Sequence, residues 1–240
     1  MSHRDERRTV VLVPGLLCDA SVWAPQRHSL ERDYDVLVPD LWGVDSIEAM
    51  AAAVLDASPE HFALAGHSMG ARVALAILDR APERVERLAL LDTGVHPRRP
   101  GEAEKRQELV DLAHTQGMAA LAERWLPPMV HPQRAGDPAL MRPLTEMVCR
   151  ATPEIFEKQV RALLNRPDAA AVLPRIGCPT LVACGRQDGW SPLSQHEEMA
   201  VAIRNAELAV IEDSGHMSTV EAPAAVTGVL SAWLRLGVMA

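Results

Sequence analysis

The sequence has few aromatic residues and no long apolar run. Phenylalanine, tyrosine and tryptophan together make up 3% of its 240 residues. No apolar stretch approaches the ~20 residues that a helix needs to cross a bilayer, so the sequence predicts no membrane-spanning segment. With 48% hydrophobic and 23% charged residues, the composition is that of a globular chain with a substantial core.

Cysteine is also scarce. The four cysteines are Cys18, Cys149, Cys178 and Cys184, and no two of them have the CxxC spacing typical of zinc or redox sites. We therefore expect reduced thiols in a cytoplasmic protein, with neither a disulfide framework nor a metal site. The chain also lacks an HExxH motif, a phosphate-binding loop and a dinucleotide fingerprint. The sequence thus predicts an activity that needs no cofactor.

Positive charge is in deficit. The 24 Lys and Arg residues stand against 32 Asp and Glu, which gives a formal net charge of -8. Nucleic-acid phosphates require clustered cations, so we expect a small-molecule substrate and no nucleic-acid partner, in a monomer or homodimer. Residues 4–8 are rich in arginine and precede an apolar run, as in a signal peptide. Acidic residues interrupt the basic stretch, however, and Pro14-Gly15 splits the run, so no signal peptide is expected.

Short apolar runs alternate with helical patterns along most of the chain. This alternation predicts an α/β protein, with a mostly parallel sheet of about six strands and helices on both faces. Residues 62–76 read as a strand, a sharp turn and a helix. The other strands are expected at 10–13, 35–38, 87–91, 179–184 and 208–211, and the other core helices at 20–30, 46–56, 192–203 and 222–236.

The alternation stops between about residues 97 and 174. That segment has no convincing strand and four helical patterns, at 102–116, 118–125, 138–150 and 153–165. A helical insertion between two strands of a sheet is typical of a lid or cap over the strand ends. We therefore predict a core domain of residues 1–96 and 175–240, with a helical cap of residues 97–174.

The stretch Gly66-His67-Ser68-Met69-Gly70 fills the G-x-S-x-G pattern of a nucleophile elbow. The expected strand before it and helix after it are those that the elbow requires. A serine at so sharp a turn is exposed at the strand end, with the first amides of the helix beside it to stabilise negative charge. The alternative is that Gly66 and Gly70 only allow close packing. The context favours Ser68 as a nucleophile.

A serine nucleophile needs a base and a carboxylate that orients the base. His216 and Asp188 each follow an expected parallel strand, so both lie at the same sheet edge as Ser68. The chain order Ser68, Asp188, His216 is the order used by this architecture. Asp92 also ends a strand and is the main rival carboxylate, with Asp213 a further one.

Several motifs together resemble those of α/β-hydrolase fold serine hydrolases, and the resemblance covers nearly the whole chain. They are Val13-Pro14-Gly15-Leu16, Pro39-Asp40-Leu41-Trp42-Gly43, the elbow, Gly185-Arg186-Gln187-Asp188 with Pro192, and Gly215-His216 with Glu221 and Pro223. The resemblance implies that the backbone amides of Leu16 and Met69 form an oxyanion hole. Relatives such as haloalkane dehalogenases carry an aspartate at the elbow, whereas Ser68 implies an acyl-enzyme.

The residues around the substrate are less well defined. Arg72, four residues after Ser68, has the serine-arginine spacing found in the menaquinone-pathway synthase of this fold, where a substrate carboxylate is handled. A structural salt bridge from helix to sheet loop is the interpretation that we favour for it. The tryptophans have two possible roles, since they either fill the core or line an apolar pocket for the substrate. The candidates for the pocket lining are Trp23, Trp42, Trp125 and Trp190, together with Leu16, Leu17 and Met69.

The sequence as a whole predicts a serine hydrolase that cleaves carboxylic esters of small to medium acyl chain. Lactone or enol-lactone hydrolysis, carbon-carbon bond hydrolysis and a lyase-type synthase reaction with the same three residues remain alternatives. A non-catalytic ligand receptor on a hydrolase scaffold is the alternative from another class of protein.

Overall fold

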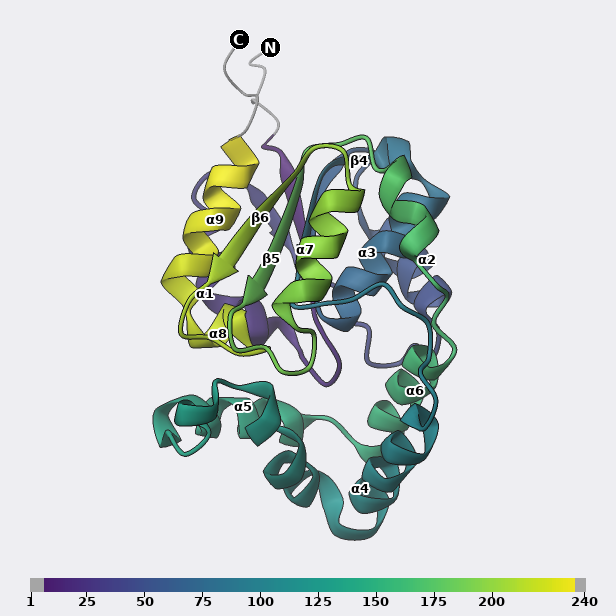
Figure 1. The fold of residues 1–240 in the computed structure, drawn as a ribbon, viewed down its shortest axis with the longest axis vertical. Helices are drawn as coiled ribbons and strands as arrows, with labels where there is room; N and C mark the ends of the chain where they lie inside the picture. The colour runs from purple at the N-terminus through teal and green to yellow at the C-terminus, as the bar shows by residue number, and fades with distance from the viewer. Residues whose placement is uncertain (1–6, 236–240) are drawn as a thin grey trace, which may run out of the picture.

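The computed structural model describes residues 7–235, which form one six-stranded sheet between two layers of helices (Figure 1). All strands are parallel, in the order β2-β1-β3-β4-β5-β6. Residues 4–6 of the arginine-rich start and Leu236 of the expected closing helix lie outside the described residues. The strands are β1 (Thr9–Val13), β2 (Asp35–Leu37), β3 (Phe62–His67), β4 (Val85–Leu91), β5 (Thr180–Gly185) and β6 (Ala206–Ile211).

The four inner strands carry the core of the sheet. β3 and β5 are buried along their whole length, and β1 and β4 almost so. The edge strands β2 and β6 are only partly buried, and Leu208 of β6 is exposed. The continuous apolar runs predicted that every strand is buried on both faces. The two edge strands are more exposed than this, because an edge strand has a neighbouring strand on one side only.

Two groups of helices cover the sheet. α1 (Ala24–Leu30) and α9 (Pro223–Arg235) pack together on one face, while α2 (Ile47–Ala57), α3 (Met69–Arg80) and α7 (Leu193–Ala202) cover the other (Figure 1). Ser46 caps α2, since its Oγ accepts a hydrogen bond of 3.1 Å from the amide of Ala49. Short turns η1 (Ala20–Trp23), η2 (Pro82–Arg84) and α8 (Ser218–Glu221) connect these elements.

Between β4 and β5 the chain is helical and contains no strand among its residues, all of which the structure describes. It forms α4 (Glu102–Trp125), η3 (Pro127–Met129), η4 (Pro132–Arg134), α5 (Pro138–Arg150), α6 (Pro153–Leu164) and η5 (Ala170–Arg175). α4 is interrupted at Gly117, whose φ of 84° breaks the helix. This break separates the two helices expected at 102–116 and 118–125.

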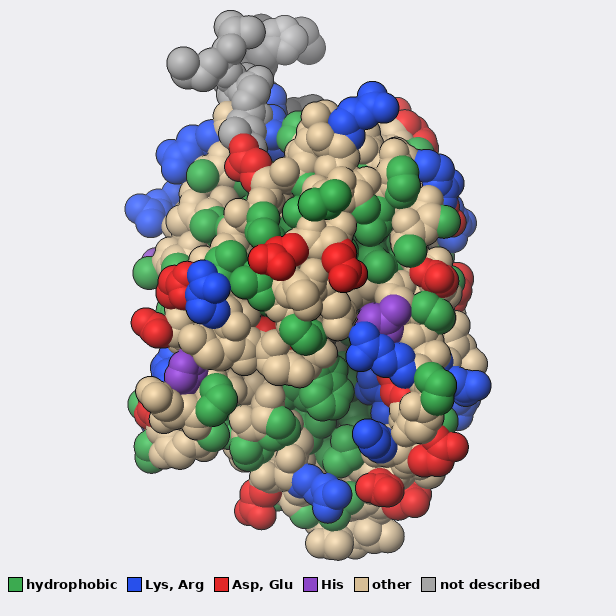
Figure 2. All heavy atoms as spheres, viewed as in Figure 1, with side chains coloured by type: hydrophobic (Ala, Val, Ile, Leu, Met, Phe, Trp, Pro, Cys, Tyr) green, Lys and Arg blue, Asp and Glu red, His purple; other side chains and the backbone are tan. Residues whose placement is uncertain are grey.

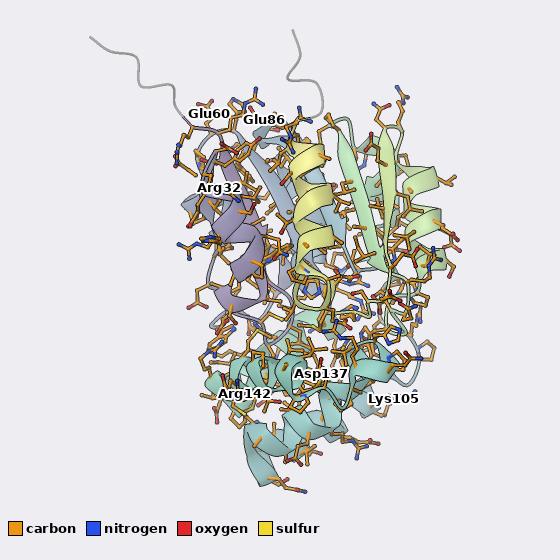
Figure 3. All side chains as sticks on the ribbon, turned by 90° about the vertical axis from the view of Figure 1, so that its left-hand side faces the viewer. Arg32, Glu60, Glu86, Lys105, Asp137 and Arg142 are labelled. Carbon is orange, nitrogen blue, oxygen red and sulfur yellow. The ribbon has the colours of Figure 1, made fainter. Side chains whose placement is uncertain are left out.

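The helices α4 to α6 lie across the carboxyl ends of the strands (Figure 1). Figure 3 shows Lys105, Asp137 and Arg142 on these helices, at the opposite end of the molecule from Glu60 and Glu86. Figure 2 shows a hollow between them and the sheet, with hydrophobic side chains at its base. Within residues 7–235, no helix has both the length and the apolar character that a membrane crossing needs.

Candidate active site

Ser68 lies at the turn from β3 to α3, with φ 54° and ψ −115°. This conformation is rare for residues other than glycine and is maintained by the packing around it. A side chain at Gly66 would collide with the Gly70 carbonyl, and one at Gly70 would collide with the backbone of Val13 and Pro14 in β1 and the following loop. Gly66 thus allows the start of α3 to fold tightly against the end of β3, and Gly70 allows it to pack against β1.

His216 reaches Ser68 from the loop after β6. Its Nε2 lies 2.8 Å from Ser68 Oγ, and the ring is buried. The loop is held by Glu221, whose Oε1 accepts the amides of Gly215 at 2.9 Å and Met217 at 3.2 Å. The distance to Ser68 Oγ is that of a hydrogen bond, so His216 is placed to take the serine proton.

Asp188 supports the other side of the imidazole. Its Oδ2 lies 2.8 Å from His216 Nδ1, and its Oδ1 accepts the amides of Trp190 and Ser191, each at 2.8 Å. An ionised carboxylate only accepts hydrogen bonds, so Nδ1 carries the proton. Nε2 then has its lone pair directed at Ser68, which is the tautomer that a general base needs.

The charges around His216 and Asp188 favour the ion pair. Burial lowers the pKa of His216, but the carboxylates, above all Asp188, outweigh burial and the net direction is upward. Burial raises the pKa of Asp188, but His216 and the two backbone amides outweigh it and the net direction is downward. Asp188 is therefore an anion at neutral pH and stabilises a protonated His216.

Asp92, the rival carboxylate, has other partners. Its Oδ1 accepts the Gly185 amide at 2.9 Å, and its Oδ2 accepts the Ser218 hydroxyl. Burial and the neighbouring Asp188 raise its pKa. His67 also faces this group, with Nε2 3.7 Å from Asp92 Oδ2, but it donates to the His216 carbonyl at 2.8 Å. Of the two aspartates, Asp188 rather than Asp92 makes the hydrogen bond to His216.

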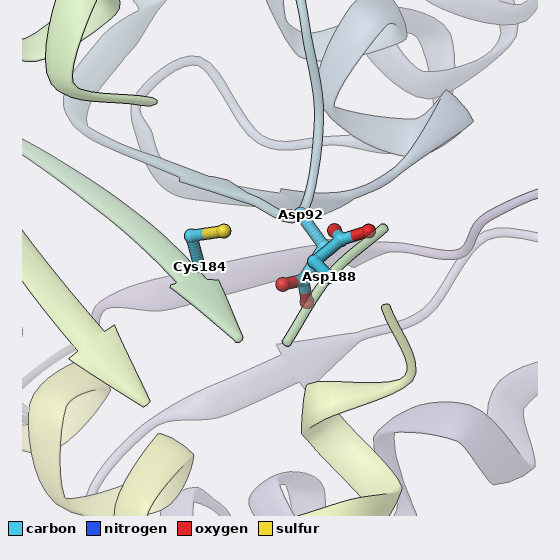
Figure 4. A group of neighbouring side chains, drawn as sticks. All are labelled: Asp92, Cys184 and Asp188. Atoms are coloured by element: carbon cyan, nitrogen blue, oxygen red, sulfur yellow. The ribbon is translucent and has the colours of Figure 1, made fainter. Parts of the chain in front are cut away.

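Asp92, Asp188 and Cys184 lie together, with one potential ligand atom of each within 4.8 Å of the others (Figure 4). A metal ion fits this group poorly. Burial raises the pKa of the Cys184 thiol, and its Sγ donates to the Gly185 carbonyl at 3.1 Å. A thiol binds metal as the thiolate, and both carboxylates already accept hydrogen bonds. The hydrogen bonds account for this cluster.

Leu16 and Met69, whose backbone amides are predicted to form an oxyanion hole, both lie close to Ser68. Met69 is the first residue of α3, and a side chain at Gly15 would lie 3.2 Å from Ser68 Cβ, so the loop before Leu16 touches the elbow. Neither the Leu16 nor the Met69 amide has an acceptor among the described residues. Free amides next to the serine match what an oxyanion requires.

Gln159 of α6 contributes a contact that sequence reasoning missed. Its Oε1 accepts the amide of Leu17 at 2.8 Å, and the side chain is buried. Leu17 has a φ of 58°, so this bond holds the loop in a strained conformation one residue after Leu16. The two partners are 142 positions apart in the sequence, and no local pattern indicates this link.

Two cavities meet at Ser68. The larger has a volume of about 340 Å³ and is lined by Arg72, Trp125 and Trp190, as predicted for a substrate pocket. The smaller has a volume of about 30 Å³ and lies toward Leu16 and Met217. Their shared wall includes Arg106, Trp125, Leu163 and Trp190.

Three residues predicted near the substrate line neither cavity. Leu17 and Trp23 have no exposed surface, because they pack in the core beneath the loop. Trp42 turns back toward the same loop, and its Nε1 donates to the Cys18 carbonyl at 3.1 Å. Their apolar character and their position after a strand suggested the pocket, but the loops fold these side chains away from it.

The parallel sheet, the elbow and the order of the site residues define the class of the protein. The chain belongs to the alpha/beta hydrolase family, whose sequence model matches residues 10–229. The predicted resemblance and fold are confirmed.

Several known proteins are similar over most of their length. A protein named "Putative carbamate hydrolase RutD", from Stutzerimonas stutzeri, is 30% identical over 238 residues, covering 88% of this chain and 86% of its own. The structure of an esterase from Thermogutta terrifontis is 30% identical with a TM-score of 0.86, covering 95% of this chain and 89% of that one. The enol-lactonase from Burkholderia xenovorans LB400 is 26% identical with a TM-score of 0.85, covering 97% and 93%.

Proposed function

We propose that the protein is a cofactor-independent serine hydrolase that cleaves carboxylic esters of small to medium acyl chain. The observation that carries the proposal is the continuous chain of hydrogen bonds from Ser68 Oγ through His216 to Asp188, with 2.8 Å at each step. The similar esterase from Thermogutta terrifontis supports the ester as substrate. Residues 97–174 act as a cap, because α4 and α6 provide walls of the cavity beside Ser68.

The proposed reaction has two halves. Ser68 Oγ attacks the ester carbonyl while His216 Nε2 takes its proton, and the amides of Leu16 and Met69 stabilise the oxyanion. His216 then gives the proton to the leaving alcohol, which leaves an acyl group on Ser68. A water molecule, deprotonated by His216, attacks this acyl-enzyme and releases the acid. Asp188 stabilises the imidazolium that forms in each half.

The test compares wild type with Ser68→Ala on p-nitrophenyl acetate, butyrate and octanoate. We expect turnover in wild type and a loss of about 10³-fold or more in Ser68→Ala, since the nucleophile is removed. A fluorophosphonate probe should add once to wild type, at Ser68, as read by intact mass and peptide mapping. Turnover that survives in Ser68→Ala, at an unchanged rate, would contradict the proposal.

A lactone substrate is the second candidate, and the similar enol-lactonase favours it. An enol-lactone is an internal ester, so the same residues attack the same type of carbonyl and the leaving alcohol stays attached. Carbamates, named for the relative from Stutzerimonas stutzeri, present a less reactive carbonyl. Including a γ-lactone and a p-nitrophenyl carbamate in the panel separates the three, because the substrate with the highest kcat/KM identifies the class.

A further inference from the structure

The larger cavity beside Ser68 has a basic lining, although the chain as a whole has a formal net charge of -8. Figure 2 shows Lys and Arg side chains along one side of the hollow. Arg99 and Lys105 are exposed, whereas the other charged groups are partly or fully buried. The lining has five cationic side chains and one carboxylate, namely Arg72, Arg99, Lys105, Arg106, Arg166 and Glu102.

The single carboxylate is already occupied. Glu102 accepts two hydrogen bonds from Arg166, at 2.8 and 2.7 Å, and one from Arg106 Nε at 2.8 Å. Arg166 also donates to the carbonyls of Leu163 at 2.6 Å and Pro97 at 3.0 Å. This arginine is thus fully used in joining α4, α6 and the loop after β4, and its role is structural.

Arg72 forms no salt bridge with the described residues. Glu102 raises its pKa only from beyond salt-bridge distance, and the one hydrogen bond that Arg72 makes within residues 7–235 is from Nη1 to the His96 carbonyl at 3.0 Å. The expected salt bridge is therefore not found, because the loop after β4 offers a carbonyl where a carboxylate was expected. Burial and the neighbouring Arg166 lower the pKa of Arg72 to about 9, so it is still cationic at neutral pH.

Arg72 is partly buried without a salt bridge, which is costly for a guanidinium, and its single hydrogen bond to the loop after β4 uses only part of its donors. Its Nε and Nη2 have no partner among the described residues, which leaves donors for a planar anion. Arg72 lies one helical turn from Ser68, and both line the same cavity. A volume of about 340 Å³ suits a small ligand with one polar end.

We propose that Arg72 determines specificity by binding a carboxylate of the substrate, while the ester carbonyl of the same molecule lies at Ser68. The unpaired donors of Arg72, the basic lining and the shared cavity carry this inference, and it rests on the proposed hydrolase function. The remainder of the substrate packs against Trp125, Phe156 and Leu163. The substrate class is therefore a half-ester or lactone of a dicarboxylic acid, or an ester of a hydroxy acid.

Two matched substrate pairs test the charge on either side of the ester. The leaving-group pair is 4-acetoxybenzoate and 4-acetoxybenzamide. The acyl-group pair is p-nitrophenyl hydrogen adipate and its terminal amide, p-nitrophenyl 5-carbamoylpentanoate. In each pair a carboxamide replaces a carboxylate of nearly the same shape. We expect wild type to prefer the carboxylate of at least one pair by about 10- to 100-fold in kcat/KM, mainly through KM, as a charge-assisted hydrogen bond predicts.

The decisive variant is Arg72→Gln, which should reduce this preference to below threefold. Arg72→Lys retains the charge without the planar donors and should keep an intermediate preference. Arg124→Gln is the matched control, because Arg124 is an exposed residue of α4 outside the cavity lining and its replacement also removes one positive charge. It should leave the preference unchanged. Equal kcat/KM within both pairs in wild type, with turnover intact, would overturn the anion subsite and leave the hydrolase proposal standing.

Binding without turnover separates the two proposals. Calorimetric titration of Ser68→Ala with adipate and adipamide should show at least tenfold tighter binding of adipate, which is lost in the Ser68→Ala/Arg72→Gln double variant. This result would support the subsite even if none of the esters were hydrolysed. Equal binding of the diacid and the diamide would overturn it, whatever the esterase assay gives.

Discussion

Two buried aspartates lie close to His216, and their surroundings shift their pKa values in opposite directions. Asp188 faces the imidazole and two backbone amides, which together lower its pKa against the effect of burial. Asp92 lies deeper, and burial and the charge of Asp188 raise its pKa. Two carboxylates in one apolar space divide in this way when only one of them has a cationic partner. Asp188 is thus the anion, and Asp92 is a structural acid.

This division predicts different results for the same substitution at the two positions. Asp188→Asn should lower kcat by about 10²- to 10⁴-fold, because an amide neither holds the tautomer nor stabilises the imidazolium. Asp92→Asn replaces a largely protonated acid by an amide of the same shape and should keep kcat within a few fold. Ester hydrolysis at pH 7 measures both, because the pKa of Asp92 is raised to about 8 and the acid is protonated at that pH. A larger loss in Asp92→Asn would identify Asp92 as the working carboxylate.

The pH dependence follows from the direction of the His216 shift. In the proposed reaction His216 accepts the serine proton only when neutral, and its pKa is raised above 6.5 by Asp188 and the other carboxylates in spite of burial. The value of kcat/KM should therefore fall as the pH drops through a midpoint above 6.5. In Asp188→Asn the carboxylate that raises the pKa most is absent, so the midpoint of the remaining activity should move to lower pH. A midpoint that stays in place would mean that another group controls the titration.

At the scale of elements, the contact between α3 and β1 depends on Gly70. A Cβ there would meet the carbonyls of Val13 and Pro14, which are backbone atoms that move only with the strand and the loop after it. Gly70→Ala should lower the free energy of unfolding by about 1–3 kcal/mol or more, as overpacking does. Gly228→Ala in α9 is the control, since nothing lies within 4 Å of a Cβ there. It should raise the free energy of unfolding by about 0.5–1 kcal/mol.

The link between α6 and the loop after β1 is the second element-scale feature. Gln159→Met removes the oxygen that accepts the hydrogen bond of the Leu17 amide, while the volume of the side chain stays similar. We expect about 1–3 kcal/mol less stability from the unsatisfied buried amide. A displaced Leu16 amide should also reduce kcat between about 10- and 100-fold.

Two controls accompany this change. Gln159→Glu keeps an oxygen acceptor and should recover most of kcat, while Lys158→Gln alters an exposed neighbour on the same helix and should have no effect. Denaturant unfolding and steady-state kinetics provide the two readouts. Full kcat in Gln159→Met would show that the cap does not position the loop.

At the scale of the whole molecule, the sequence indicated the fold well because local patterns determine it. Short apolar runs predicted all six strands, and the break at Gly117 separates the two helical patterns that were expected there. The elbow motif and the loops after β5 and β6 also indicated Ser68, Asp188 and His216. The structure brings these three side chains within hydrogen-bond distance. Their catalytic roles stay predictions for the assays above.

The lining of the cavity was harder to predict, because it depends on contacts between distant segments. Trp42 and Leu17 follow strands as pocket residues do, yet the loops turn them into the core or onto a carbonyl. A charged partner was predicted for Arg72, whereas the structure provides the neutral carbonyl of His96. No sequence pattern indicated the contact of Gln159 with the Leu17 amide. Each depends on how the helical segment sits on the sheet, which no local pattern in one sequence encodes.

Both ends of the described chain lie away from the cavity. β1 starts at Thr9 and α9 finishes at Arg235 at the end of the sheet opposite α4 to α6, as Figure 1 shows. An affinity tag or a surface tether at either terminus would therefore orient an immobilised layer of this protein with its cavity toward the liquid. A biosensor or flow reactor made in this way keeps substrate access without any redesign of the helical segment.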